Sequence, residues 1–108
     1  MLMVRAIVRP EKIDEVLAAL MYAGFPSVTK MDVFGRGKQR GIKMGETTYD
    51  ELPKEMIFTV IHTKDKDFVI ETIMKSARTD TRGAFGDGKI FISSVDESYT
   101  VSSGKCDL

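Results

Sequence analysis

A short glycine-rich turn that leads directly into a strand constrains the fold of this chain more than any other feature. The turn, Gly86–Lys89, has the sequence GDGK and runs into the β-branched and aromatic stretch Ile90–Ile92. Its two glycines let the backbone approach a bulky anion, and Lys89 adds a positive charge suited to phosphate. With Gly83 the segment reads G-x-x-x-x-G-K, but Ile90 stands where a P-loop needs Ser or Thr, and a P-loop opens a helix. The sequence therefore predicts a phosphate-binding turn that feeds a strand.

The elements predicted along the chain are strand, helix, strand, loop, strand, helix and strand. Runs rich in β-branched and aromatic residues predict the strands Leu2–Val8, Val28–Phe34, Lys54–His62 and Ile90–Val95. Between them, apolar residues recur at helical spacing. The two apolar stripes are Ile13, Val16, Leu17, Leu20 and Met21, ending before Gly24, and Val69, Ile70, Ile73, Met74 and Ala77. This order predicts an α+β chain with the ferredoxin-like βαββαβ fold.

Composition narrows the class of protein. The 108 residues fit a single domain, and 43% hydrophobic and 30% charged residues are typical of a globular protein. Basic and acidic residues number 16 each, so no net field attracts nucleic acid or an anionic membrane. The single cysteine, Cys106, excludes an internal disulfide, and no segment reads as a membrane span or signal peptide. We therefore expect a cytoplasmic protein without membrane insertion.

Three further features each leave two interpretations. The basic, glycine-rich Gly35–Gly41 is either a solvated hairpin tip or a second anion-binding loop. Lys54, at a strand start, is either solvated or the partner of a carboxylate ligand. Phe58 and Phe91 occupy strands where RNA-binding modules of this fold place stacking aromatics, but each lies in an apolar run, so we expect core packing and no nucleic acid. No catalytic constellation stands out, and His62 alone predicts no zinc site.

Over almost its full length the chain resembles the PII (GlnB-like) family of nitrogen-regulatory signalling proteins, most of all the nitrogenase-associated NifI-type branch. The resemblance rests on Arg5–Pro10, Thr29, Asp32–Gly41, Leu52–Lys54 and Gly86–Ile92. It implies a homotrimer of ferredoxin-like subunits with a nucleotide in each cleft between neighbours. It also implies one PII-like domain over residues 1–108, with a T-loop at about 37–52, a B-loop at about 79–89 and a C-terminal segment at about 96–108.

The resemblance further implies a set of binding residues. ATP or ADP would contact Thr29, Gly35, Gly37, Lys38, Val60, Gly86, Asp87, Gly88 and Lys89. The effector 2-oxoglutarate would contact Gln39, Gly41 and Lys54, and Gln39 would also hold Mg²⁺ beside ATP. On this view Lys54 acts apart from the B-loop, so its removal is expected to weaken 2-oxoglutarate binding more than ADP binding.

The chain also departs from the family pattern. Thr100 and Ser102 stand where many members have phosphate-binding arginines, which predicts a lower nucleotide affinity or a role for Arg82 or Lys89. The B-loop is longer than usual. The T-loop is shorter, so Tyr49 does not match securely the tyrosine that some relatives have modified.

The function implied by the resemblance is signal transduction in nitrogen fixation. The protein would sense ATP, ADP and 2-oxoglutarate and regulate nitrogenase by T-loop contact, together with a paralogous NifI-type subunit. The alternative is a PII-type regulator of an ammonium transporter or of glutamine synthetase. We expect no enzyme, with slow ATP hydrolysis as the open alternative.

Overall fold

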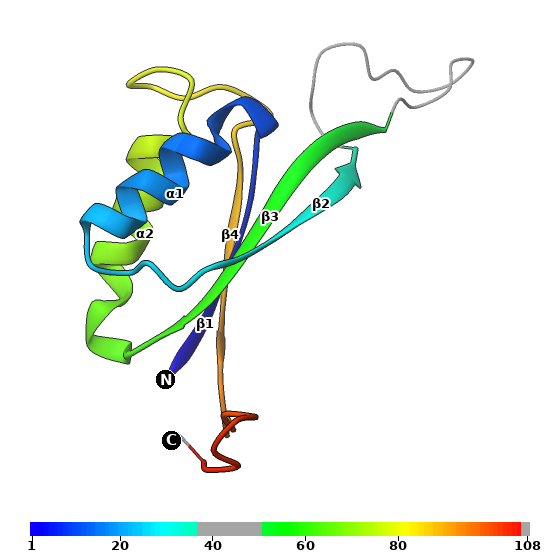
Figure 1. Ribbon diagram of the computed structural model, residues 1–108. Coiled ribbons are helices and arrows are strands. Elements are labelled where there is room, and N and C mark those ends of the chain that lie inside the picture. The colour runs from blue at the N-terminus through cyan, green and yellow to red at the C-terminus, as the bar shows by residue number, and fades with distance from the viewer. Residues whose placement is uncertain (37–50, 107–108) are drawn as a thin grey trace.

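The computed structural model describes residues 1–36 and 51–106. Four strands and two α-helices follow one another in the predicted order (Figure 1). They are β1 (Leu2–Val8), α1 (Ile13–Tyr22), β2 (Thr29–Gly35), β3 (Leu52–Ile61), α2 (Lys66–Ala77) and β4 (Gly88–Ser94). A short 3-10 turn precedes each helix, at Pro10–Lys12 and Thr63–Asp65. The predicted ferredoxin-like α+β fold is confirmed.

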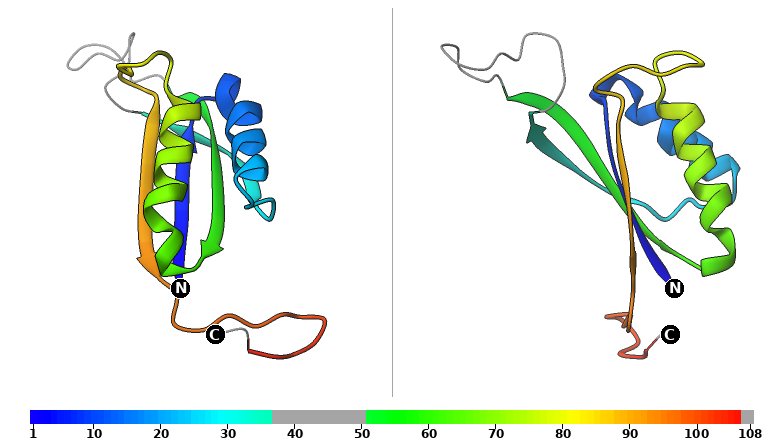
Figure 2. Two further views of the ribbon diagram at one scale, coloured as in Figure 1. Left: turned by 90° about the vertical axis from the view of Figure 1, so that its left-hand side faces the viewer. Right: turned by 180° about the vertical axis from the view of Figure 1, so that it is seen from behind.

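The strands form a single antiparallel sheet in the order β2-β3-β1-β4, and both helices pack on the same face of it (Figure 1, Figure 2). Because β1 pairs along its length with both β3 and β4, Val8 lies opposite Glu55 on one side and Gly88 on the other. Residues 52–54 of β3 pair with β2 alone and extend the sheet as a two-stranded ribbon. The glycine-rich turn therefore enters the sheet at the end where β1 finishes and the ribbon begins.

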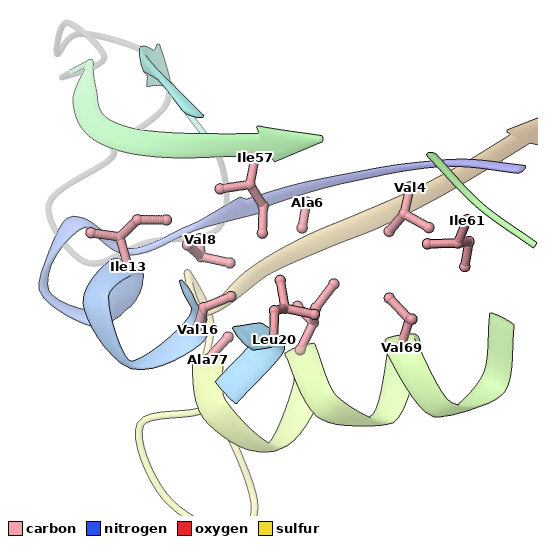
Figure 3. Packing of buried hydrophobic residues seen from close by; sticks show 11 residues of the cluster. Val4, Ala6, Val8, Ile13, Val16, Leu20, Ile57, Ile61, Val69 and Ala77 are labelled. Atoms are coloured by element: carbon pink, nitrogen blue, oxygen red, sulfur yellow. The ribbon is translucent and has the colours of Figure 1, made fainter. Parts of the chain in front are cut away.

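The hydrophobic core lies between the helices and the sheet face that they cover (Figure 3). Alternate residues of the central strands point toward the helices, as strand geometry requires. The buried cluster consists of Val4, Ala6, Val8, Ile13, Val16, Leu20, Ile57, Ile61, Val69, Ile73 and Ala77. Gly24, with φ +97°, ends α1, and the next amide, Phe25 N–H, donates to the Leu20 carbonyl across the helix end.

Part of the predicted core is exposed. Met21 and Met74 were assigned to the apolar stripes of the helices, but their exposed fractions are 64% and 43%. That assignment is wrong because only the central line of each stripe meets the sheet. Phe91 is also half exposed, at 50%, so the expectation that it packs in the core is wrong for the single chain.

Phe91 belongs to the sheet face that the helices do not cover, which we call the open face. Arg5 lies directly between Phe58 and Phe91 in a row across three strands of this face. Their neighbours along the strands point to the opposite side, where Val4, Ala6 and Ile57 are buried and Ile90 and Ile92 are partly buried. The open face therefore carries a row of two aromatic rings and a cation.

Candidate functional site

The connection between α2 and β4, residues 78–87, arches past the end of α2 and returns to the sheet beside β1 (Figure 2). It enters the sheet at Gly88, whose φ of +126° disfavours any other residue. A Cβ at Gly88 would also overlap the main-chain oxygen of Ile7. The second glycine of the turn is thus required by the close approach of two strands as well as by its own conformation.

The carboxylate of Asp87 organises this connection from within. It accepts hydrogen bonds from the main-chain N–H of Ala84 at 2.8 Å and of Thr79 at 3.3 Å. Arg9 Nε donates to the same carboxylate at 3.0 Å, and Arg9 Nη2 donates to the carbonyl of Phe85 at 2.7 Å. The guanidinium at the end of β1 therefore holds the side chain and the main chain of the turn together.

The charge state of Asp87 follows from these contacts. Burial of the side chain, which is 15% exposed, opposes ionisation of the carboxyl. The hydrogen bonds from Ala84, Arg9 and Thr79 outweigh that effect and hold the pKa of Asp87 below its usual value. The carboxylate is thus ionised at neutral pH and stabilises the conformation of the turn.

Lys54 also belongs to this turn. Its side chain is buried, with 8% of the residue exposed, and Nζ donates to the carbonyl of Gly86 at 2.6 Å. Burial, aided by the positive charge of Arg9, lowers the pKa of Lys54 from its ordinary value. The expectation that Lys54 acts apart from the B-loop is therefore wrong. The reason is topological: the start of β3 lies beside the end of β1, next to the turn.

The structure brings together only some of the expected nucleotide-binding residues. Gly86, Asp87, Gly88 and Lys89 are contiguous, but Thr29 and Val60 lie elsewhere on the sheet. Lys89 pairs with Ile7, whereas Val60 pairs with Met3. This places Val60 four residues along the strands and two strands across from Lys89, roughly 17 Å away. One chain alone does not assemble the expected set.

The remaining expected residues lie farther from the turn or outside the described residues. Gly35 ends β2 at the tip of the ribbon. The C-terminal segment carries Thr100, whose main-chain amide donates to Lys105, and it lies at the opposite end of the sheet from the turn (Figure 1). Gly37, Lys38, Gln39, Gly41 and Tyr49 lie outside the described residues.

Arg9 is the contact to the turn that sequence reasoning missed. The residue was noted only as part of a motif, Arg5–Pro10, and no role was assigned to it. A usable signal was present, because the βαββαβ order places the end of the first strand beside the start of the last. A cation at that strand end is then a neighbour of the glycine-rich turn.

Glu55 of β3 lies on the other side of β1 from Asp87 and has its own charged neighbours. Glu55 faces Asp32 across the β2–β3 pair, and interaction with the Asp32 carboxyl, followed by burial, raises the pKa of Glu55. Lys30 Nζ lies 3.9 Å from Glu55 Oε1. Glu55 Oε2 is buried and has no hydrogen-bond partner among the described residues. The base of the ribbon thus holds an acidic pair with too few donors.

Two kinds of feature are absent from residues 1–36 and 51–106. No helix in these ranges has the length and apolar character needed to cross a bilayer. No cluster of three or more His, Cys, Asp or Glu side chains in the same ranges has an arrangement that could hold a metal ion.

The fold and the turn together define a small ferredoxin-like domain with a glycine-rich turn at the entrance to its last strand. The sequence matches the family described as nitrogen regulatory protein P-II over residues 1–105, and the chain belongs to this family. It is 54% identical over 108 residues, the whole of both chains, to "nitrogen fixation nifHD region glnB-like protein 1" of Methanococcus maripaludis.

Two further relatives are similar over nearly the same length. A nifHD region GlnB-like protein 1 of Methanobacterium ivanovii is 54% identical over 101 residues, covering 94% of this chain and 93% of the relative. "Nitrogen regulatory protein P-II 2" of Methanothermobacter thermautotrophicus is 47% identical over 104 residues, covering 93% and 88%. The similarity thus extends to P-II proteins named for nitrogen regulation and for nitrogen-fixation regions.

Proposed function

We propose that this P-II protein senses ATP, ADP and 2-oxoglutarate and regulates nitrogenase through the loop between β2 and β3. Membership of the family of nitrogen regulatory proteins supports the signalling role. The names of relatives from nitrogen-fixation regions favour nitrogenase as the target. The single structural observation that carries the proposal is the turn before β4, which is held in shape by Arg9, Lys54 and Asp87.

The turn fits the phosphates of a nucleotide. Its shape is fixed by internal contacts, so little ordering cost falls on binding. Lys89 is exposed and forms no ion pair with any described residue, which leaves its ammonium group available for a phosphate. On the proposed scheme Gly86–Lys89 bind the phosphates, while Gly35, Gly37 and Lys38 form the facing wall.

The effector and metal are assigned to the loop that follows β2. Gln39 would hold Mg²⁺ together with ATP and 2-oxoglutarate, and Gly41 and Lys54 would bind the 2-oxoglutarate carboxylates. A buried ammonium group such as that of Lys54 suits a carboxylate. Because Lys54 also donates to Gly86, its two roles must be separated experimentally.

Calorimetry with matched variants makes that separation. Wild type is expected to bind ATP and ADP competitively, and 2-oxoglutarate well only with Mg-ATP. Lys54→Gln keeps a donor for the Gly86 carbonyl but loses the charge, so it should weaken 2-oxoglutarate more than ADP. Lys54→Met loses both and should weaken both ligands. Equal losses for both ligands in Lys54→Gln contradict the assignment, and a Lys89→Ala protein that binds ADP like wild type contradicts the phosphate site.

We propose a homotrimer, in which the open face is covered and a neighbour supplies the missing wall of the site. The exposed Phe91 and the distance between Lys89 and Val60 support this arrangement, because Thr29 and Val60 of an adjacent subunit could then meet the turn. Light scattering should give three times the mass of the 12.1 kDa chain. Phe91→Glu should lower that mass while the circular dichroism spectrum is retained. A wild-type protein of single-chain mass at micromolar concentration refutes the trimer.

Two rival functions are tested directly. A phosphate-release assay, with Lys89→Ala as control, distinguishes ligand sensing from slow ATP hydrolysis. A pull-down from nitrogen-fixing cells, with and without Mg-ATP and 2-oxoglutarate, tests the target. Retention of nitrogenase and a paralogous NifI-type subunit only without 2-oxoglutarate supports the proposal. Recovery of an ammonium transporter or glutamine synthetase instead supports the alternative.

A further inference from the structure

A cavity of about 790 Å³ lies beneath the connection from α2 to β4, on the helix-covered side of the molecule. Its apolar floor comes from three elements: Val8 of β1, Ile73 and Ala77 of α2, and Ile90 of β4. Met74 and Phe85 also line it, and both are largely exposed to solvent. The volume lies in the range of small-molecule sites, and such sites are mostly apolar with a few polar groups.

The cavity also carries positive charge that nothing nearby neutralises. Arg78 and Arg82 line it, and neither side chain forms a hydrogen bond or ion pair with a described residue. The lining acid, Asp87, is already engaged by Arg9.

Two further acids, Asp80 in the connection and Glu71 on α2, are occupied as well. Asp80 accepts main-chain hydrogen bonds from Arg82 and Gly83 within its own turn, at 2.8 and 2.9 Å. Glu71 on α2 pairs with Lys75 at 2.9 Å. An apolar cavity with two unpaired arginines beside it is complementary to a molecule with an apolar body and an anionic head.

We propose that this cavity binds a small amphipathic organic anion, an alkyl, acyl or aryl group that carries a phosphate or carboxylate. The apolar body packs against Met74, Phe85 and the floor, and the head is paired with Arg78 and Arg82. The site opens on the side of the connection that faces α2, whereas Thr29, Val60 and Phe91 lie on the open face of the sheet. Binding in this cavity does not require a bound nucleotide. The anion would therefore be a second ligand that acts on the same turn.

The test uses octyl phosphate below its micelle-forming concentration, with inorganic phosphate and 1-octanol as the matched half-ligands. Binding is followed by ¹H–¹³C methyl spectra of the full-length protein. Octyl phosphate is expected to shift the methyl signals of Met74, Ala77, Ala84 and Ile90 saturably. Each half-ligand should bind at least about tenfold more weakly, because it lacks either the ion pairs or the apolar contacts. Equal binding of 1-octanol and octyl phosphate overturns the proposal.

Variants locate the site. Arg78→Gln and Arg82→Gln should each weaken octyl phosphate binding about fivefold, the size expected for a partly solvated ion pair. Phe85→Ala should weaken it by a similar factor, and its exposed side chain can be removed without loss of core packing. Lys66→Gln removes an exposed cation at the start of α2 that forms no ion pair with a described residue and does not line the cavity, so it should leave the affinity unchanged. If Lys66→Gln has the same effect as Arg82→Gln, the binding is non-specific and the proposal is wrong.

Two further arms separate this site from its neighbours. With saturating ATP, octyl phosphate should still shift the same methyl signals, with affinity changed by less than about threefold, since the two anions are screened from each other. Full displacement of octyl phosphate by ATP would show that the cavity is part of the nucleotide site, and binding only to phosphatidic acid vesicles would show a membrane surface. Either result overturns the proposal. A protein that binds octyl phosphate but no ATP refutes the proposed function and leaves this inference intact.

Discussion

Asp87 and Glu55 flank the same end of β1 and occupy opposite electrostatic surroundings. Asp87 accepts from Arg9 and from two main-chain amides, whereas Glu55 faces another carboxyl group and has a buried oxygen with no donor among the described residues. The comparison shows that the turn before β4 is complete as it stands, while the base of the β2–β3 ribbon holds acidic charge that a proton or cation could still neutralise. The turn before β4 therefore has a fixed shape, whereas the base of the ribbon can respond to a change in its charge.

The largest expected effect tests how rigidly the turn region is built. Gly88→Ala should lower the free energy of unfolding by about 3 kcal/mol or more, because the new Cβ both overlaps the Ile7 carbonyl and strains a positive φ. Gly24→Ala is the matched control, since Gly24 also has a positive φ but no atom within 4 Å of its Cβ position. Gly24→Ala should lower the free energy of unfolding by only about 1–2 kcal/mol. Urea denaturation measures both, and equal losses would show that the close approach at Gly88 is unimportant.

Asp87→Asn tests the charge of the turn. It should lower the free energy of unfolding by about 1–3 kcal/mol at pH 7, because Arg9 and two main-chain amides lose a charged acceptor. The pKa of Asp87 is lowered in the folded chain, so its stabilising effect is present above the unfolded value, about 3.9, and is lost as the pH falls through the folded value. The difference between wild type and variant should therefore shrink below about pH 4. A difference that is constant from pH 7 to pH 3 would contradict this account.

A smaller effect is expected from Arg9→Lys. Lysine keeps the charge, but it lacks the guanidinium geometry that lets Arg9 donate to Asp87 and to the Phe85 carbonyl at once. The free energy of unfolding should therefore fall by about 1 kcal/mol. Arg82→Lys is the control, because the Arg82 side chain forms no hydrogen bond or ion pair with a described residue, and it should change little. The thermal midpoints of the two variants decide the matter, and identical midpoints would refute a special role for Arg9.

Glu55→Gln should give the smallest change in folding stability, and it should raise stability where the other substitutions lower it. The pKa of Glu55 is raised in the folded chain, so its stabilising contribution is fully present below the unfolded value, about 4.3, and is lost as the pH rises through the folded value. Glutamine should therefore gain stability relative to wild type between pH 4 and pH 7. Urea midpoints across this range provide the measurement. If the variant instead becomes less stable than wild type as the pH rises, the ionised pair of Glu55 and Asp32 is favourable. That result would remove the contrast with Asp87.

Sequence reasoning succeeded where the signal is local. The strand and helix order followed from residue periodicity, and the glycines of Gly86–Lys89 marked the turn, although β4 begins at Gly88, two residues earlier than predicted. It failed at Met21, Met74 and Phe91, because periodicity marks an apolar side chain but not whether another element covers it. The position of Lys54 beside the turn was missed for a related reason: residues 32 positions apart meet only through the pairing of three strands.

The sequence by itself determined the order of elements, the entry of a glycine-rich turn into a strand and the family to which the chain belongs, since all three depend on residue types and spacing along the chain. Tertiary structure alone decided that Arg9 and Lys54 hold the turn, that Asp87 is surrounded by donors and Glu55 is not, and that two arginines line an apolar cavity. These contacts depend on strand register and on which residues share one end of a sheet, and a linear pattern specifies neither until the chain has folded.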